Sequence, residues 1–193
     1  SAWTSACWCC FADAPAANAA SGVGYRLTQD QCTSHIQREK STGPSTIQDL
    51  WSSFPKAMTR DPKLVGDYAK LLIERGAGKD AEQILRDQLK RLWSDPLAEL
   101  YGLAEGEHPN KQLGMAEFWL KSQPNNPVLL FCAARLSLRL QLWGKARTYL
   151  ENSLSILPRA DGYSELAQLL VRLGEPELAT EYYRRGLESA ATH

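Results

Sequence analysis

The sequence lacks an excess of charge of either sign. Its 22 Lys and Arg side chains balance 22 Asp and Glu side chains, so the formal net charge is zero. A balanced chain has no general electrostatic attraction for nucleic-acid phosphates or for an anionic membrane surface. We therefore expect no nucleic-acid partner, and any charged binding site must be a local patch.

Long hydrophobic runs are also absent. The longest run, from Val128 to Ala134, is far shorter than the roughly 20 apolar residues that a membrane-spanning helix needs. We therefore expect no membrane span within this chain. Because the chain begins with Ser and not Met, we expect a fragment or a processed product, from which an upstream anchor could have been cut away.

Cysteine and histidine are too few and too scattered to indicate a metal site or a disulfide framework. The five cysteines are an odd number and form no paired CxxC motif. Cys7, Cys9 and Cys10 could bind a soft metal or become oxidised, but no histidine lies near them. Cys132 belongs to an apolar segment and is expected to be buried. None of the three histidines, which are His35, His108 and His193, has a metal-ligand spacing such as HExxH.

Catalytic motifs are missing as well. The sequence contains no GxSxG nucleophile elbow and no phosphate-binding GxxxxGK[ST] loop. The Asp and Glu residues are spread over polar helix faces, which is typical of a solvated surface. We therefore predict that the protein is not an enzyme and that it holds no metal and no resident cofactor.

The first 44 residues contain little structural information. Trp and Cys are concentrated in residues 1–11, and residues 12–24 are rich in Ala, Asn, Ser and Gly, which indicates a linker or a partly ordered loop. A weak periodicity allows a helix over 27–39. From Ser45 to Phe54 the apolar residues follow a helical stripe, and Pro55 ends it. We predict a tail over 1–44 and a folded domain over 45–193.

The rest of the chain is a repeat. Dipeptides that favour the start of a helix occur at Asp61-Pro62, Asp95-Pro96 and Asn126-Pro127, and Asp161-Gly162 is a degenerate fourth. The intervals between them are 34, 31 and 35 residues. A period of this length is typical of stacked helical hairpins.

Four pairs of alanines, each pair 12 residues apart, fix the register of the repeat. Large residues stand four positions before the first alanine and four positions after the second. Small residues allow two helices to cross closely, and large neighbours fill the space beside the crossing. The predicted packing pairs are Ala69 and Ala81, Ala104 and Ala116, Ala134 and Ala146, and Ala167 and Ala179.

This spacing resembles the tetratricopeptide repeat, whose 34-residue unit has small residues at its eighth and twentieth positions. Gly76 and Gly174 match the turn between the two helices of that unit, and Pro158 matches its late proline. We predict an all-α, right-handed superhelical array of four such hairpins, with an extra helix in front. The predicted units are 61–93, 95–124, 126–158 and 160–190. The short interval and the 105–113 loop make the second unit irregular.

A more specific resemblance rests on the phrases WSSFPKAMTRDPKLVGDYAKLLIERG, ELYG, MAEFWLKSQPNNPVLL and LRLQLWGKARTYLENSL. Over residues 46–188 these are similar to the C-terminal region of the HemY family of bacterial inner-membrane proteins. The resemblance implies a tetratricopeptide scaffold that assists late haem synthesis at the inner membrane, on an unknown side, with haem-biosynthesis enzymes as partners.

Arrays of this kind bind partners on a concave side lined by the first helix of each unit. Arg135, Arg139 and Arg172 are expected to form a basic strip there, suited to a carboxylate-bearing peptide, an acidic protein or the propionates of a tetrapyrrole. The alternative is that these arginines are merely solvated. The full candidate groove is Lys63, Lys70, Glu74, Tyr101, Phe131, Arg135, Leu138, Arg139, Gln168 and Arg172.

Two other functions remain open from the sequence. A carrier or sensor could hold haem or another porphyrin, with Phe131 or Tyr101 stacking on the macrocycle. A general tetratricopeptide adaptor would have no link to haem. Trp143, at the turn of the third hairpin, is expected to be a core residue, but it could also be a docking point at the edge of the groove.

Overall fold

The computed structural model describes residues 34, 44–56 and 58–191, and these ranges contain α-helices and one short 3₁₀-helix but no strand. Asp61 and Asn126 cap their helices through side-chain oxygens, as the sequence predicts, and a proline follows each cap. The helices are α2 (Pro44–Ser53), η3 (Met58–Arg60), α3 (Pro62–Glu74), α4 (Gly78–Arg91), α5 (Asp95–Leu103), α6 (Pro109–Ser122), α7 (Pro127–Arg139), α8 (Trp143–Ile156), α9 (Ala160–Arg172) and α10 (Pro176–Ala191).

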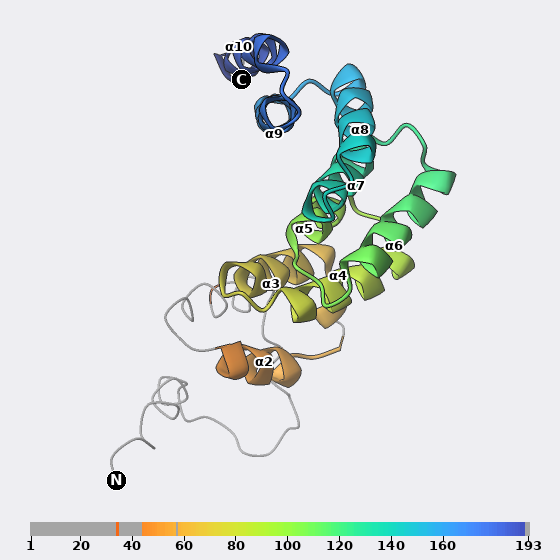
Figure 1. The fold of residues 1–193 in the computed structure, drawn as a ribbon. Coiled ribbons are helices and arrows are strands. Elements are labelled where there is room, and N and C mark those ends of the chain that lie inside the picture. The colour runs from red at the N-terminus through yellow and green to blue at the C-terminus, as the bar shows by residue number, and fades with distance from the viewer. Residues whose placement is uncertain (1–33, 35–43, 57, 192–193) are drawn as a thin grey trace, which may run out of the picture.

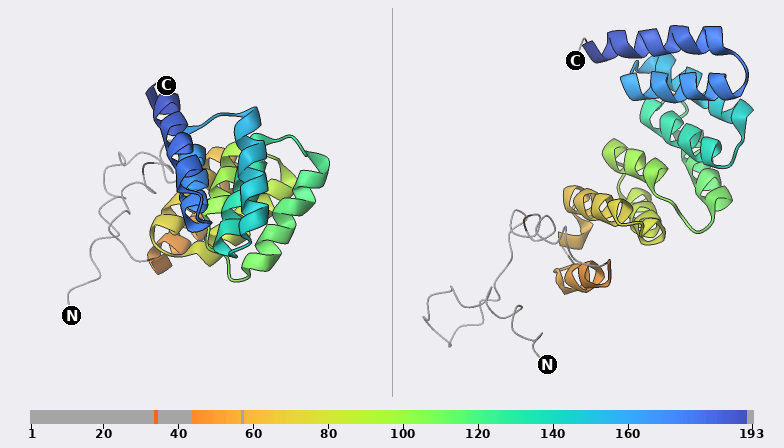
Figure 2. Two further views of the ribbon diagram at one scale, coloured as in Figure 1. Left: turned by 45° about the horizontal axis from the view of Figure 1, so that its top comes forward. Right: turned by 60° about the vertical axis from the view of Figure 1, so that its left-hand side comes forward.

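The helices stack in chain order into an elongated, curved array (Figure 1). In the view of Figure 1, α3 and α9 lie toward the left edge and α4, α6 and α8 lie further to the right, with α5 and α7 between them. Seen from the left edge, the layers rise from α2 to α10 (Figure 2). The all-α, superhelical fold expected from the repeat is therefore confirmed.

Several features expected near the N-terminus lie outside the described residues. These are the predicted tail over 1–44 apart from Ser34 and Pro44, the weak helix over 27–39 apart from Ser34, and the cluster of Cys7, Cys9 and Cys10. The predicted helix from Ser45 to Phe54 corresponds to α2. Its Trp51 ring stacks on Tyr68 of α3 with 4.0 Å between ring centroids, which attaches α2 to the first unit.

All eight alanines of the predicted pairs are buried. Seven lie within helices, but Ala104 follows α5, because that helix has nine residues and ends at Leu103. The crossing of two helices at an alanine pair therefore does not describe the second unit. There α5 packs more closely on α7 than on α6, and Gly102 lies directly against Cys132.

The large residue after each second alanine shows how the units cover one another. Leu85 and Leu150 are fully buried, whereas Tyr183, at the same repeat position in the last unit, is 40% exposed. Each of the first two belongs to a unit that is followed by a further unit of the array. No further helix of the described chain covers Tyr183.

The turn between the two helices of a unit has the same backbone form in three of the four units. Gly76, Gln141 and Gly174 each stand seven residues after the first alanine, with φ angles of 73°, 59° and 80°. In each case the next residue donates its N–H to a carbonyl at the end of the preceding helix, as in a Schellman cap. Gln141 therefore occupies a left-handed position that glycine holds in the other two units.

Replacing Gln141 with glycine should stabilise the protein. A non-glycine residue in the left-handed region raises the free energy of the folded state by about 1–2 kcal/mol. Glycine avoids this strain, but it loses more conformational entropy on folding, so the net gain from the substitution is smaller. We expect Gln141→Gly to raise the free energy of unfolding by about 1 kcal/mol, measured by urea denaturation. Gly174→Ala should lower it by a similar amount, and a neutral result for both variants would contradict the assignment of strain to this turn.

Candidate partner-binding groove

The predicted groove residues divide into exposed, partly buried and buried groups. Lys63, Lys70 and Glu74 of α3 and Gln168 and Arg172 of α9 are exposed. Arg135, Leu138 and Arg139 of α7 are partly buried, and Tyr101 and Phe131 are buried. The exposed members thus lie on the first and the last units.

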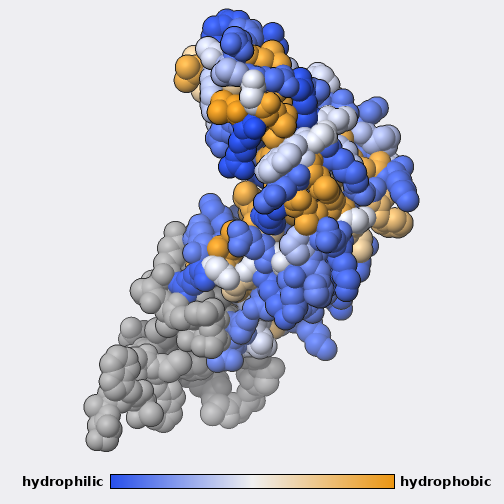
Figure 3. Space-filling model, viewed as in Figure 1, coloured by the Kyte–Doolittle hydropathy of each residue, from blue (hydrophilic) through white to orange (hydrophobic). Residues whose placement is uncertain are grey.

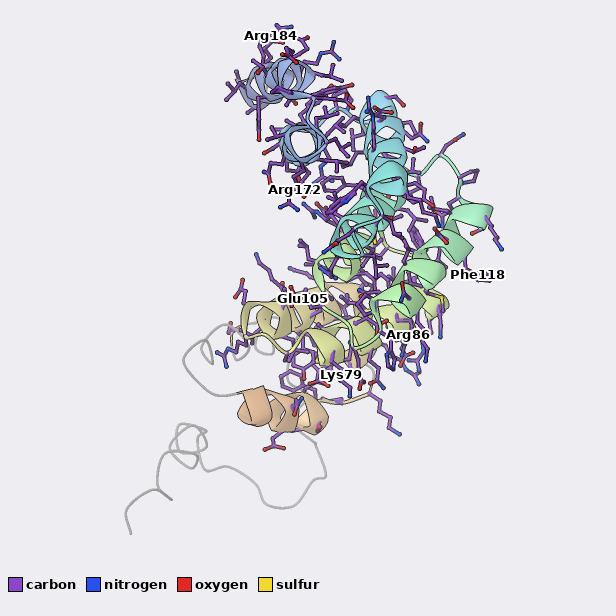
Figure 4. All side chains as sticks on the ribbon, in the orientation of Figure 1. Lys79, Arg86, Glu105, Phe118, Arg172 and Arg184 are labelled. Carbon is purple, nitrogen blue, oxygen red and sulfur yellow. The ribbon has the colours of Figure 1, made fainter. Side chains whose placement is uncertain are left out.

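Arg172 extends from α9 on the hollowed side of the array, whereas Phe118 projects from α6 at the opposite edge (Figures 3 and 4).

Tyr101 is a core residue, which corrects its expected place in the groove. Its side chain has 0% exposure, and its hydroxyl donates a 2.9 Å hydrogen bond to Glu82 Oε1. Its ring packs edge-on against Trp119 with centroids 5.1 Å apart. Burial, followed by the nearby Glu82 carboxylate, raises the pKa of Tyr101 well above its usual range. Phe131, which stands at the same repeat position in the third unit, is buried as well, so this position belongs to the core in both units.

Phe131 requires the same correction. Its side chain is 1% exposed. The guanidinium groups of Arg135 and Arg159 cover its ring at 4.1 and 4.4 Å from the ring centroid. Two cations over the ring, together with its burial, occupy the space that another aromatic system would need for stacking. A porphyrin therefore cannot reach the ring in this arrangement.

Arg135 and Arg159 belong to an ion network that joins three units. Arg135 contacts Glu165 Oε1 at 2.7 Å and Asp161 Oδ2 at 3.5 Å. Arg159 pairs with Asp161 at 2.6 Å and also with Glu99 of α5. The network therefore sets two guanidinium groups against three carboxylates. The positive charges of Arg135 and Arg159 are neutralised by carboxylates of the same chain, so they attract an anionic ligand only weakly.

The two carboxylates on α9 differ in their protonation behaviour. Burial raises the pKa of Glu165, and the neighbouring Arg135 only partly opposes this effect. For Asp161 burial acts in the same direction, but its hydrogen bonds with Arg159 prevail and the net pKa is lowered. Glu165 Oε2 is buried without a hydrogen-bond partner among the described residues. The network therefore retains one unsatisfied acceptor.

Arg139 is also committed to a partner within the chain. Its guanidinium donates to the carbonyl oxygens of Ala104, Leu103 and Gly102 at 2.8, 3.2 and 3.4 Å. These are carbonyls at the C-terminal end of α5, where helical partners are missing. A cation at this end also interacts favourably with the helix dipole. Arg139 thus stabilises the short helix of the irregular unit.

Arg139→Ala should therefore destabilise the fold, not merely alter a surface. Hydrogen bonds to a charged group contribute about 1.5–3 kcal/mol, so we expect a loss of about 2 kcal/mol in the free energy of unfolding. Arg172→Ala is the matched control. It removes an exposed guanidinium 5.8 Å from the Trp143 ring, and an exposed contact of this kind contributes about 0.5–1 kcal/mol. Equal effects of the two variants in thermal unfolding would contradict the structural role of Arg139.

Two acidic residues at one repeat position were not predicted from the sequence. Asp67 and Glu165 each stand two residues before the first alanine of their unit. Each has one buried carboxylate oxygen without a hydrogen-bond partner among the described residues. The same position holds Gly102 in the second unit and Cys132 in the third. The register of the repeat places both acidic residues at one position, but the sequence does not show that their oxygens are buried.

Asp67 lines a pocket between the first helices of units one and two. The pocket has a volume of about 410 Å³, within the range of small-molecule and side-chain sites. Its walls are mainly apolar, and Lys63 stands at the same wall as Asp67. The lining includes Lys63, Gly66, Asp67, Pro96, Leu97 and Leu100.

Two absences hold for the described part of the chain. Residues 34, 44–56 and 58–191 contain no group of three or more His, Cys, Asp or Glu side chains placed to hold a metal ion. Within the same ranges, no helix combines the length and the apolar character needed to cross a bilayer.

Comparison with known proteins bears on the fold. No protein-family model matches the chain. No curated protein matches it. Among solved structures, TTC0263, a thermophilic TPR protein in Thermus thermophilus, superposes with a TM-score of 0.64 at 15% identity, over 85% of this chain and 92% of that chain. The fold is that of a tetratricopeptide-repeat array.

A second solved structure extends the likeness. MamA 41-end from Desulfovibrio magneticus RS-1 superposes with a TM-score of 0.58 at 14% identity, over 88% of this chain and 98% of that chain. At such low identity these structures share the fold with this chain and say nothing of its partners. The tetratricopeptide resemblance is thereby confirmed for the fold.

Proposed function

We propose that this chain is a non-enzymatic scaffold that binds other proteins along its hollowed side. One observation carries the proposal. Long, polar and exposed side chains, Lys63 and Lys70 on α3 and Gln168 and Arg172 on α9, belong to the first helices of the first and last units, and in such arrays the first helices line the concave side. Between α3 and α9 the helices α5 and α7 are in close contact, and Phe131 of α7 is buried, so the middle of the array is closely packed. A partner that follows this side would meet polar contacts at both ends.

The charge of these ends defines which partner fits. Arg135 and Arg139 are engaged within the chain, so they supply little attraction for a carboxylate. Lys63, Lys70 and Arg172 remain exposed. An acidic or carboxylate-bearing partner would therefore be held by α3 and by the end of α9, and not by the centre of the array.

The finer proposal concerns the pathway. On the basis of the phrases shared with HemY proteins, we propose that the scaffold assists late haem synthesis at the bacterial inner membrane and is anchored there by a segment outside this chain. Enzymes of late haem synthesis would then be its partners. A tetratricopeptide adaptor without a link to haem agrees with the fold likeness equally well. The identity of the partner separates the two.

Photo-crosslinking provides this test. A benzophenone amino acid replaces Lys70 or Gln168, two exposed residues of the predicted groove. In a matched variant it replaces Phe118, which is 63% exposed and projects from α6. The variants are irradiated with bacterial inner membranes, and the products are identified by mass spectrometry. We expect a late haem-synthesis enzyme to be captured from Lys70 and Gln168 but not from Phe118.

Each other outcome is informative. Capture of unrelated proteins from the hollowed side would favour the general adaptor. Capture from Phe118 alone would move the interface to the opposite edge and overturn the proposed groove. Absence of any product from all three positions would argue against a scaffold in this membrane.

Titration with haem examines the carrier function. Because the Tyr101 and Phe131 rings are buried, we expect no shift of the Soret band when haem is added to the protein. A shift that disappears in the double variant Arg135→Ala and Arg139→Ala would instead favour a tetrapyrrole carrier. Circular dichroism of the double variant must show intact helices, because Arg139 stabilises α5.

A further inference from the structure

The apolar core of the array is divided into two clusters that meet on α7. Cys132 and Leu136 of this helix pack in one cluster with buried residues of α3, α4, α5 and α6. Phe131 and Ala134, on another face of α7, pack in a second cluster with α8, α9 and α10. The half-buried Tyr149 of α8 packs against both clusters. An N-terminal body, α3–α6, and a C-terminal body, α8–α10, are therefore joined at α7.

One ion pair connects the two bodies across α7. Glu99 of α5 and Arg159, the N-cap residue of α9, form a salt bridge although they lie 60 residues apart in the sequence. Helix α5 belongs to the second unit and α9 to the fourth, so this pair passes over the third unit. In a stacked array each unit contacts mainly its immediate neighbours. The contact between the second and fourth units is therefore additional to the packing of the repeat.

Arg159 is held in place by contacts other than the one with Glu99. Its guanidinium donates to both carboxylate oxygens of Asp161, at 2.6 and 2.7 Å, and lies 4.4 Å from the centroid of the Phe131 ring. Its side chain is 21% exposed. An arginine fixed in this bidentate way loses less side-chain freedom when it pairs again, and ion pairs within a network contribute more than isolated surface pairs. The pair with Glu99 is thus an effective tie between α5 and α9.

This tie can be removed without leaving an unpaired arginine. The network sets Arg135 and Arg159 against three carboxylates, those of Glu99, Asp161 and Glu165. Without Glu99, each arginine keeps a carboxylate partner on α9 and the charges of the network balance. Loss of the pair should therefore release the two bodies from one another without unfolding either of them.

We propose that the Glu99–Arg159 pair is a clasp that holds the C-terminal body against the N-terminal body and sets the distance between the exposed side chains of α3 and those of α9. The inference rests on the proposed partner-binding role, because a partner that contacts both helices must match this distance. Glu99 and Arg159 are positioning residues and do not need to touch the partner. When the clasp opens, α8–α10 pivot about α7, and the first helices of the second and fourth units move apart.

Distances between two spin labels, measured by double electron–electron resonance in the whole chain, test the clasp. The labels replace Lys70 on α3 and Gln168 on α9, which are both exposed. They are attached through p-acetylphenylalanine, which leaves the native cysteines unlabelled. We expect Glu99→Ala to shift the α3–α9 distances to larger values and to broaden their distribution. Glu99→Gln keeps an acceptor oxygen but not the charge, so it should give a smaller shift in the same direction.

Two controls separate a pivot at α7 from a general loosening of the fold. A second label pair, at Lys70 and at Phe118 of α6, lies within the N-terminal body, so its distances should not respond to Glu99→Ala. Glu181→Ala removes ion pairs that lie entirely within α10, and it should leave the α3–α9 distances unchanged. Circular dichroism measures the helix content of each variant.

An α3–α9 distribution that is the same in the natural protein and in Glu99→Ala overturns the proposal, as does an equal response of the two label pairs. If Glu99→Ala loses helix content, Glu99→Gln decides: a shift to larger distances supports the clasp, and an unchanged distribution refutes it.

The clasp and the scaffold function fail separately. Capture of a partner from Lys70 and Gln168, together with distances that do not respond to Glu99→Ala, would keep the scaffold and refute the clasp. Distances that respond as expected, without any captured partner, would keep the clasp and argue against the scaffold.

Discussion

Phe131→Ala is expected to lower the free energy of unfolding by about 4 kcal/mol, because truncating a buried aromatic residue removes both its transfer energy and its packing. The ring is 1% exposed, and the guanidinium groups of Arg135 and Arg159 lie over it. Its loss would also leave Arg135 and Arg159 without the surface on which they rest. Urea denaturation followed by circular dichroism measures the effect.

Phe118→Ala is the matched control for this substitution. The same truncation at a 63% exposed ring should change the free energy of unfolding by no more than about 0.5 kcal/mol. A Phe131→Ala variant as stable as Phe118→Ala would contradict the buried position of the ring. It would then restore Phe131 as a candidate surface for stacking on a ligand.

Gly78→Ala should be the next most damaging change, although it adds only one methyl group. A Cβ at this position would lie 2.6 Å from the carbonyl oxygen of Glu105 and 2.7 Å from its nitrogen. Backbone atoms cannot move aside as a flexible side chain can, so α4 must separate from the loop that follows α5. We expect a loss of about 3 kcal/mol in the free energy of unfolding.

Gly114→Ala makes the same chemical change where nothing lies within 4 Å of the added carbon. In the interior of α6 alanine favours the helix over glycine by about 1 kcal/mol, so this variant should be more stable than the natural protein. If Gly78→Ala lowers the free energy of unfolding and Gly114→Ala raises it, the difference identifies the close approach of the two backbones at Gly78. A stabilising Gly78→Ala would show that the two backbones are further apart.

These effects matter for binding because they concern the irregular second unit. Gly78 faces the loop after α5, and Arg139 holds the carbonyls at the end of that helix. The pocket that contains Asp67 uses α5 for one wall. A displacement of α5 should therefore change the shape of this pocket even when the exposed lysines of α3 are unchanged.

The sequence determined the repeat and its helices. Local signals, such as the Asp61 and Asn126 caps and the alanine pairs, depend only on residues close in the chain, and they placed the helices of units one, three and four. The same register marked Asp67 and Glu165 as equivalent positions. It also placed glycine at two of the three left-handed turns.

Only the tertiary structure decided which of these side chains remain available to a partner. Arg135 meets Asp161 and Glu165, and Arg139 meets the end of α5, through contacts that span 26–37 residues of sequence. No local pattern specifies such pairings, because they follow from how adjacent units are stacked. Burial of Tyr101 and Phe131 has the same origin. The sequence thus specifies the periodic array of helices. Packing between units buries or pairs the central candidate residues and leaves the polar residues of α3 and of the end of α9 exposed.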